Sequence, residues 1–396
     1  MYKKLLVLFV LGILTGAYFF IKNYYHIDEN ALFTAIKPPS RDVAKLLNEN
    51  PSQSGPFTIF GDYKISVFAD LGKESPRVLA FDANGVLYAS IPSLGKIVAL
   101  PDKNKDDVAD EIKTVISDLN SPHGFFIYNN NLYIAETGRV ISYFYFEDEF
   151  RVSAPEELFE LPSGGRHFTR TIKVNDDNLY TTVGSSCDVC QENDSRRAAI
   201  LVSDMYGKNL EVFASGLRNT VFFDFDSEGN IWGSDMGRDF LGDNLPPDEL
   251  NNIKKGKNYG WPFCFGKQVR DSRHLAEVSF NCSQTEASSF DYPAHIAPLG
   301  TTFIKPGVLP EEYEGDLLVS FHGSWNSSVK VGYKIVRIDF ENGKPIQLKD
   351  FVSGFLDEND DVLGRPVDLI FDSEGKLYIS DDKANLIYVV SEGSAE

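Results

Sequence analysis

The chain has 396 residues, in which 58 acidic side chains against 38 basic ones give a formal net charge of −20 at pH 7. Such a negative charge argues against a nucleic-acid partner, because phosphate binding needs a basic face. Hydrophobic residues make up 42% and charged residues 24%, which is typical of a globular protein and argues against a disordered chain. Any anionic ligand must therefore be bound by a local cluster of Arg, Lys or His.

The N-terminus has the pattern of an export signal. Two lysines precede an unbroken apolar run over residues 5–21, which is short for a membrane span but typical of a secretory signal. We therefore expect residues 1–26 to be either a signal peptide or an uncleaved membrane anchor. Both alternatives place the remaining chain in the periplasm or on the extracellular face. The polar, proline-containing residues 27–56 are predicted to be a tether before a domain over residues 57–396.

The four cysteines are expected to form two disulfides, because an exported protein matures in an oxidising compartment. The simplest pairing is local, Cys187 with Cys190 and Cys264 with Cys282, although four cysteines allow three pairings. A zinc site and a redox-active pair are the alternatives. Only one Cys-x-x-Cys motif is present and no helix follows it, which disfavours both.

A short pattern recurs six times along the chain: an apolar strand, a tight turn, and a second strand of small and aromatic residues. The turns contain Asn-Gly, Glu-Gly or Asn-rich sequences, which predict β-hairpins. Successive copies lie about 45–50 residues apart, with a larger gap before the fifth, and this spacing is typical of β-propeller blades. The copies are residues 78–92, 124–138, 171–185, 221–237, 301–323 and 367–382.

The sequence therefore predicts an all-β fold, a six-bladed β-propeller with four-stranded blades. The apolar segment 57–71 precedes the first copy, and we expect it to close the ring as a strand of the last blade, where it covers a sheet edge. A doubly wound α/β fold would need helical patterns between the strands, and the sequence does not show them.

The residues that flank each hairpin are predicted to form a binding site. Those before the first strand and after the second lie on the same face of the disc, and the innermost strands surround the central channel. For His123 and His295, a structural role at a strand start is an equally good interpretation. The flanking arginines and histidines are Arg77, His123, Arg166, His167, Arg218, His295, His322 and Arg365, and Asn219 accompanies them.

Arginines beside neutral imidazoles suit a ligand with several carboxylates and a reaction that needs a proton acceptor. Arg binds carboxylates through two parallel hydrogen bonds. His titrates near neutral pH and can accept a proton in a transition state. The residue types alone thus indicate an anion-binding site that is capable of base catalysis.

Residues 216–266 contain GLRNT, a predicted strand, then GRD, LPPDELN and NYGWP. This series resembles the soluble quinoprotein sugar dehydrogenases, the glucose/sorbosone dehydrogenase family, which includes aldose sugar dehydrogenase-like proteins. The resemblance covers most of the chain after about residue 65, including the segments FHGSWN and GRPVD. Thr220, where proline is usual, and Met236, where Asn or Gln is commoner, depart from the pattern.

The resemblance implies a propeller that binds pyrroloquinoline quinone (PQQ), a tricarboxylate, and Ca²⁺ at the channel mouth. His167 matches the family's general base, and Arg218 matches the residue that stabilises the developing oxyanion, so both are expected to be catalytic. The expected cofactor-binding residues are Arg218, Asn219, Arg365, His322, Arg77 and His123.

The same resemblance implies metal ligands. The carbonyls of Gly237 and Arg238 match the family's calcium position, and Ca²⁺ prefers oxygen ligands. Glu249 with the Tyr259 carbonyl resembles a second, structural calcium site. The family's cofactor lysine has no obvious counterpart: His322 occupies the nearest position, and Lys334 is a weaker candidate.

The predicted function is that of a quinoprotein oxidoreductase, which oxidises the anomeric hydroxyl of an aldose or the aldehyde of a sorbosone-like substrate with PQQ as hydride acceptor. Because the sequence has no haem-binding Cys-x-x-Cys-His motif, the electrons are expected to pass to an external acceptor. A sugar- or protein-binding propeller without the cofactor is one alternative. A calcium-dependent lactonase is another, but it needs a carboxylate cage where this sequence has Arg and His.

Overall fold

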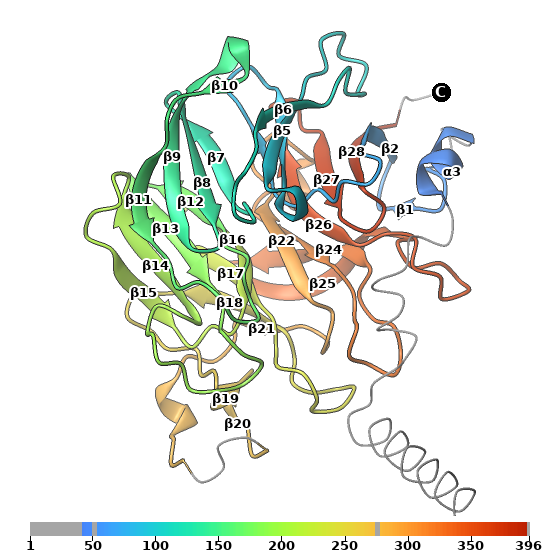
Figure 1. Cartoon of the computed structure of the whole chain (residues 1–396). Helices are drawn as coiled ribbons and strands as arrows, with labels where there is room; N and C mark the ends of the chain where they lie inside the picture. The colour runs from blue at the N-terminus through green and yellow to red at the C-terminus, as the bar shows by residue number, and fades with distance from the viewer. Residues whose placement is uncertain (1–41, 50–53, 274–277, 394–396) are drawn as a thin grey trace, which may run out of the picture.

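The computed structural model describes residues 42–49, 54–273 and 278–393. Over these ranges the chain forms antiparallel sheets around a central axis, with one short α-helix (Figure 1). Six sheets of four or five strands are the blades, which confirms the predicted all-β, six-bladed propeller.

The blades follow one another along the chain, and each predicted repeat falls on the first hairpin of a blade. Blade 1 holds β3 (Leu79–Phe81), β4 (Leu87–Ile91), β5 (Lys96–Leu100) and β6 (Lys113–Ile116); blade 2 holds β7 (Phe125–Tyr128), β8 (Asn131–Glu136), β9 (Arg139–Phe146), β10 (Arg151–Val152) and β11 (Glu156–Glu160); blade 3 holds β12 (Ile172–Asn175), β13 (Asn178–Val183), β14 (Ala199–Asp204) and β15 (Glu211–Ser215). Blade 4 holds β16 (Thr220–Phe225), β17 (Ile231–Asp235), β18 (Glu249–Ile253) and β21 (Phe290–Asp291); blade 5 holds β22 (Pro298–Phe303), β23 (Leu317–Phe321), β24 (Lys334–Glu341), β25 (Lys344–Ser353) and β1 (Thr58–Ile59); blade 6 holds β26 (Pro366–Phe371), β27 (Leu377–Asp381), β28 (Leu386–Glu392) and β2 (Tyr63–Asp70).

The same turn chemistry recurs in the first hairpins of blades 1, 4 and 6. Asp82 Oδ1 accepts hydrogen bonds from two backbone N–H groups of its own turn, and Asp226 and Asp372 do the same in theirs. Three residues after each aspartate comes a glycine with φ between +80° and +88°, which an L side chain would strain. These turns hold the flanking apolar segments together as paired strands, whose side chains pack between neighbouring blades.

The ring is closed by the N-terminal strand, as predicted. β2 pairs antiparallel with β28 along its length, and Phe68 of β2 packs edge-on against Tyr378, with ring centroids 5.0 Å apart. The shorter β1 pairs instead with β25 of blade 5. The single strand predicted over 57–71 is therefore divided between two neighbouring blades.

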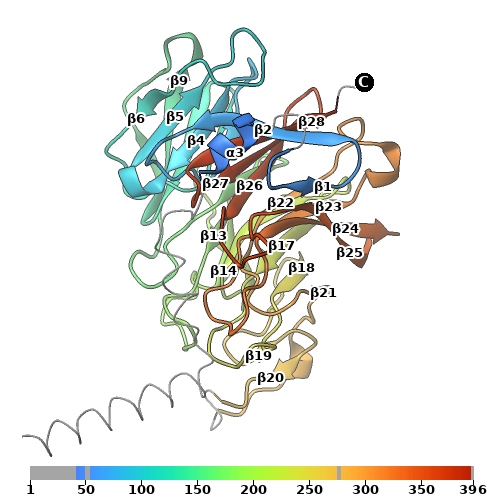
Figure 2. The same cartoon turned by 90° about the vertical axis from the view of Figure 1, so that its right-hand side faces the viewer.

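One short helix precedes the ring. α3 (Val43–Glu49) lies beside β2, and Val43 and Leu47 are buried in the apolar core of blades 5 and 6 (Figure 2). These two residues are one helical turn apart, so they present one apolar face to the propeller. Residues 43–49 thus pack on the folded domain, which differs from the tether predicted over 27–56.

Both predicted disulfides are present, Cys187–Cys190 and Cys264–Cys282. The second lies in an insertion of blade 4 that also carries a hairpin of β19 (Cys264–Phe265) and β20 (Val269–Arg270). Disulfides fit a protein that matures in an oxidising compartment. The predicted signal or anchor, residues 1–26, lies outside the described residues. Within the described ranges, no helix has the length and apolar character needed to cross a membrane.

Candidate active site

The residues that begin the innermost strands line one cavity of about 670 Å³. They meet because every inner strand starts on the same face of the ring. All four arginines and four histidines predicted for the channel mouth contribute to the wall, and a volume of this size suits a small-molecule ligand. The predicted residues found there are Arg77, His123, Arg166, His167, Arg218, Asn219, Gly237, His295, His322 and Arg365.

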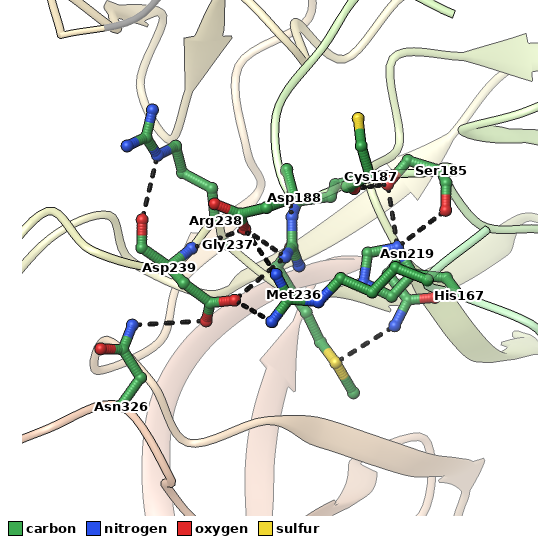
Figure 3. A network of polar contacts seen from close by, with 12 residues as sticks. His167, Ser185, Cys187, Asp188, Asn219, Met236, Gly237, Arg238, Asp239 and Asn326 are labelled. Atoms are coloured by element: carbon green, nitrogen blue, oxygen red, sulfur yellow. Dashed lines mark hydrogen bonds and ion pairs between the residues drawn. The ribbon is translucent and has the colours of Figure 1, made fainter. Parts of the chain in front are cut away.

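His167 is held in one tautomer. Its Nδ1 lies 3.0 Å from the Ser185 carbonyl oxygen and 2.8 Å from Ser185 Oγ, and that hydroxyl donates to the Cys187 carbonyl at 2.7 Å (Figure 3). Because the Ser185 proton is used on Cys187, both oxygens near Nδ1 act as acceptors. Nδ1 therefore carries the proton, and the lone pair of the neutral ring is on Nε2. Nε2 forms no hydrogen bond with any residue that the structure describes.

The protonation state of His167 follows from its surroundings. Burial, and then the positive charges of Arg218 and Arg166, lower the pKa of His167 to about 3. Both effects disfavour the imidazolium. The ring is therefore neutral at physiological pH, which is the state that a proton acceptor needs.

Two arginines and two aspartates form an ion-pair cluster beside His167 (Figure 3). Arg218 Nη2 lies 2.7 Å from Asp188 Oδ1 and 3.6 Å from Asp239 Oδ2, and Arg166 Nη2 lies 2.5 Å from Asp239 Oδ2. Although burial alone would raise the pKa of Asp188, Arg218 holds it below its usual value. Burial raises the pKa of Asp239. The cluster fixes the Arg218 guanidinium at the cavity wall.

Buried aspartates at the ends of β17 and β27 fix the backbone of two cavity arginines. Asp235 accepts the backbone N–H of Arg218 at 2.9 Å and that of Asn219 at 2.8 Å. Asp381 accepts the backbone N–H of Arg365, also at 2.9 Å. Burial raises the pKa of Asp235 and of Asp381 to about 6. A buried aspartate that accepts backbone N–H groups thus positions Arg218 before blade 4 and Arg365 before blade 6.

A second charged group lies on the wall formed by blades 1, 5 and 6. Asp382 Oδ2 pairs with Arg77 Nη1 at 2.5 Å, and Asp382 Oδ1 lies 2.9 Å from His322 Nε2. Although burial alone would raise the pKa of Asp382, His322 and Arg77 hold it below its usual value. Burial, and then the charge of Arg365, lower the pKa of His322 to about 4. His322 is therefore a neutral donor and does not replace the charge of a lysine.

Two buried polar groups remain available to a ligand. Arg365 is 8% exposed and donates to the carbonyls of His322 and Gly323, but it makes no ion pair with a described carboxylate. His123 is 1% exposed, with Nδ1 at 3.2 Å from the Arg170 carbonyl, and its buried Nε2 has no hydrogen-bond partner among the residues that the structure describes. Burial lowers the pKa of His123 well below its usual value. Because His123 Nδ1 donates to a carbonyl, its Nε2 is an acceptor. Both residues line the cavity, so an anion that also carries an N–H or O–H donor would satisfy them.

Of the predicted metal residues Gly237 and Arg238, only Gly237 lines the cavity. Gly237 lines the cavity, and its N–H donates to Asp248 Oδ1 at 2.7 Å. Arg238 is not part of the lining, and its guanidinium pairs with Asp271 at 2.9 Å. Asp248 also lines the cavity, and its carboxylate accepts the backbone N–H groups of Gly237 and Ala297.

Three other predicted residues lie away from the cavity wall. Glu249 Oε1 accepts the backbone N–H of Gly266 at 2.5 Å, and the Tyr259 hydroxyl donates to the Asn252 carbonyl at 2.6 Å. Lys334, the weaker candidate for the cofactor lysine, opens β24 and pairs with Asp350 at 2.6 Å. None of the three lines the cavity.

Sequence reasoning did not single out several cavity residues and their partners. Asp188 and Asp239 bind the predicted arginines, and signals for both were present, because Asp188 lies inside Cys-x-x-Cys and Asp239 ends the GRD motif. Phe168, 49% exposed, and Trp325 add aromatic surface to the wall. Only the folded loops bring these residues together.

Part of the cavity wall is apolar. Val221, Met236 and Leu299 contribute apolar surface between the charged groups. The cavity thus combines the Arg365 guanidinium for a carboxylate, apolar contacts for a ring system, and the neutral imidazole of His167 with a free lone pair on Nε2. Such a site can bind a planar polyanion and remove a proton from a second ligand.

Comparisons with known proteins agree with this chemistry. A family model described as TrAA12-like matches residues 58–393. An uncharacterised protein of Borreliella burgdorferi is 33% identical over 345 residues, which cover 83% of this chain and 89% of that protein. The pyrroloquinoline quinone-dependent pyranose dehydrogenase of Coprinopsis cinerea is 23% identical over 395 residues, which cover 81% of this chain. The match spans about half, 52%, of that enzyme's length.

Two solved structures share the fold. The iodide structure of a Trichoderma reesei carbohydrate-active enzyme of family AA12 superimposes with a TM-score of 0.73 at 21% identity, covering 85% of this chain and 97% of that one. The holo form of the PQQ domain of the Coprinopsis cinerea pyranose dehydrogenase gives a TM-score of 0.71 at 20% identity, with the same coverage.

Proposed function

Since the chain belongs to the TrAA12-like family, we propose that it is a quinoprotein sugar dehydrogenase, which oxidises the anomeric hydroxyl of an aldose with PQQ as the hydride acceptor. The aldehyde of a sorbosone-like compound is the second substrate class. The proposal is supported by a relative whose name describes it as PQQ-dependent and acting on pyranoses.

The observation that carries the proposal is a pair of buried groups in one cavity, one guanidinium without a carboxylate and one imidazole nitrogen without a hydrogen bond among the described residues. Arg365 has no carboxylate partner among the described residues, and the buried Nε2 of His123 has no hydrogen bond. Burying such groups is costly unless a ligand binds them. PQQ carries three carboxylates that can accept hydrogen bonds from Arg365, a pyrrole N–H that can donate to the Nε2 lone pair of His123, and a flat ring system that suits the apolar wall.

The residues of the chain divide the reaction between them. PQQ, when bound, supplies an ortho-quinone that can accept two electrons and a proton together, as hydride. His167 Nε2 accepts the hydroxyl proton as the sugar loses hydride from its anomeric carbon and becomes a lactone. Arg218 uses three of its five N–H groups on Asp188 and Met236, and the remaining two can stabilise the charge that develops on oxygen. Asn219 lies next in the chain and completes this side of the cavity.

Calcium and the electron acceptor form the rest of the proposal. The carbonyls of Gly237 and Arg238 would bind Ca²⁺ together with the cofactor, since Ca²⁺ prefers oxygen ligands. Glu249 and the Tyr259 carbonyl would bind a second, structural ion outside the cavity. The reduced cofactor would be reoxidised by an external acceptor. This would take place on the outer side of the membrane, because disulfides indicate an oxidising compartment.

A dye-linked assay tests the proposed function. The full chain is loaded with PQQ and Ca²⁺ and mixed with a panel of aldoses, a sorbosone-like aldehyde and an artificial dye acceptor. We expect reduction of the dye that requires both PQQ and a sugar. Absence of PQQ binding and of dye reduction with every substrate would instead favour a sugar- or protein-binding propeller without the cofactor.

A further inference from the structure

We propose that the loop closed by Cys187–Cys190 is a clamp for both catalytic side chains, and that Asp188 within it is a positioning residue for Arg218. The inference rests on the proposed function, because it concerns the same site. It differs from that function in assigning a task to a disulfide and to an acidic residue that do not line the cavity.

Two atoms of Asp188 contact the Arg218 guanidinium, and weaker contacts reach Arg166 at 3.7 Å and the Trp261 indole at 3.3 Å. Its carboxylate Oδ1 lies 2.7 Å from Arg218 Nη2, and its backbone carbonyl accepts from Arg218 Nε at 2.9 Å (Figure 3). Oδ1 also accepts the backbone N–H of Asp239 at 3.0 Å. Arg218 is thus held by two atoms of one residue, so its planar guanidinium has one orientation.

The same loop orients the base. Ser185 Oγ lies 2.8 Å from His167 Nδ1 and donates to the carbonyl of Cys187 at 2.7 Å. The hydroxyl proton of Ser185 is therefore directed at the first residue of the disulfide loop. If Cys187 moved, Ser185 Oγ could donate to Nδ1 instead, and only the Ser185 carbonyl would still favour the tautomer that leaves Nε2 free.

The disulfide acts locally. It joins residues only three apart, whereas Cys264–Cys282 joins residues 18 apart. Because the stabilisation from a cross-link increases with the length of the loop it closes, the shorter bridge contributes less to global stability. The Cys187–Cys190 disulfide instead restricts the backbone of Cys187 and Asp188, which lies between the side chains of His167 and Arg218.

The test compares two variants with two matched controls. Asp188→Ala removes the carboxylate, and Cys187→Ser/Cys190→Ser opens the loop. Asp194→Ala is the control for the first, because Asp194 pairs with Arg196 and does not line the cavity. Cys264→Ser/Cys282→Ser is the control for the second. Each protein is measured for kcat, for KM of the sugar, for PQQ affinity by absorbance titration, and for Tm.

We expect both test variants to lower kcat on the order of 10–100-fold, the usual effect of misplacing a catalytic group, and to weaken PQQ binding. KM for the sugar should change little, and Asp188→Asn, which keeps the shape and one acceptor, should recover part of the loss. The controls should keep wild-type kcat and PQQ affinity. If the test variants instead lower only Tm, with kcat and PQQ affinity unchanged, the clamp is wrong.

A crystal structure of the Cys187→Ser/Cys190→Ser variant separates this inference from the proposed function. If wild type neither binds PQQ nor oxidises a sugar, the proposed function fails, but the clamp can still be judged. Loss of the Arg218–Asp188 ion pair in the variant would support the clamp. An unchanged ion pair and an unchanged His167–Ser185 contact would overturn it.

Discussion

Each of three cavity histidines is buried near a guanidinium, and this combination determines its charge. The pKa of His167 is lowered to about 3 by burial, Arg218 and Arg166, and that of His322 to about 4 by burial and Arg365. Burial also lowers the pKa of His123 well below its usual value. In the cavity of this acidic protein the imidazoles are therefore in the unprotonated base form at neutral pH, and the arginines carry the positive charge.

Substituting the base tests its role directly. His167→Gln keeps a donor for Ser185 but has no lone pair that can accept a proton at neutral pH. We expect kcat to fall by about 10²–10⁴-fold, the usual contribution of a positioned base. PQQ affinity, measured by absorbance titration, should be unchanged and serves as the control. Undiminished kcat would remove His167 from the mechanism.

An NMR titration tests the charge states without the cofactor. Since each pKa is lowered from 6.5, the neutral ring persists as the pH falls, and protonation occurs only well below the usual range. We expect the imidazole signals of His123, His167 and His322 to remain unshifted between pH 8 and about pH 5.5. Assignment uses the single His→Gln variants. A cavity histidine that titrates near pH 6.5 would contradict this account of the site.

At the scale of elements, the end of β13 brings two blades close enough for His167 and Asn219 to share one wall. Gly184 follows β13, and a Cβ added there would lie 2.5 Å from Asn219 Oδ1 and 2.6 Å from His167 Cβ. Side chains at such distances must move. The absence of a side chain at this position therefore determines the spacing of two predicted site residues.

Gly184→Ala should displace one or both neighbours and lower kcat/KM by about tenfold or more, because small misplacements of catalytic groups are costly. Gly138→Ala is the matched control, since its Cβ would meet only Ser163 Cβ at 3.4 Å. The control should behave as wild type in the dye-linked assay. Equal kcat/KM for the two variants would show that the close approach at Gly184 has no catalytic consequence.

The strands and turns could be predicted from the sequence where residues close together in the chain determine them. The hairpins were predictable because Asn-Gly, Glu-Gly and Asn-rich turns and apolar periodicity are local signals, and the mouth residues followed from strand order. The ion-pair partners Asp188 and Asp239 could not be predicted, because only the folded loops bring them next to Arg218 and Arg166. The burial of α3 and the division of 57–71 between two blades depend on neighbouring blades, so no local pattern marks them.

At the scale of the whole molecule, the cavity depends on ring closure. β2 covers the open edge of blade 6 by pairing with β28, and its Phe68 is 2% exposed between the strands and Tyr378. If this strand detached, blades 1 and 6 could separate. Arg77 and Asp382, which pair across that boundary at 2.5 Å, would then lose their geometry.

Phe68→Ala should lower the free energy of unfolding by about 3–5 kcal/mol, the usual cost of removing a buried aromatic ring. Phe60→Ala is the matched control on the same segment, because Phe60 is 46% exposed, and it should cost about 1 kcal/mol or less. Chemical denaturation of the two variants measures both values. Similar losses of unfolding free energy in the two variants would mean that the buried side chains of β2 do not stabilise the closure of the ring.

The most direct test of the central claim is an equilibrium titration of the full chain with PQQ in the presence of Ca²⁺, followed by the absorbance of the cofactor. The account predicts binding of one PQQ per chain at micromolar concentration. It also predicts that Arg365→Ala weakens binding by about 10–100-fold, since a charged hydrogen-bonded contact typically contributes about 1.5–3 kcal/mol. No binding by wild type, or equal affinity in the variant, would contradict the assignment of this cavity to PQQ.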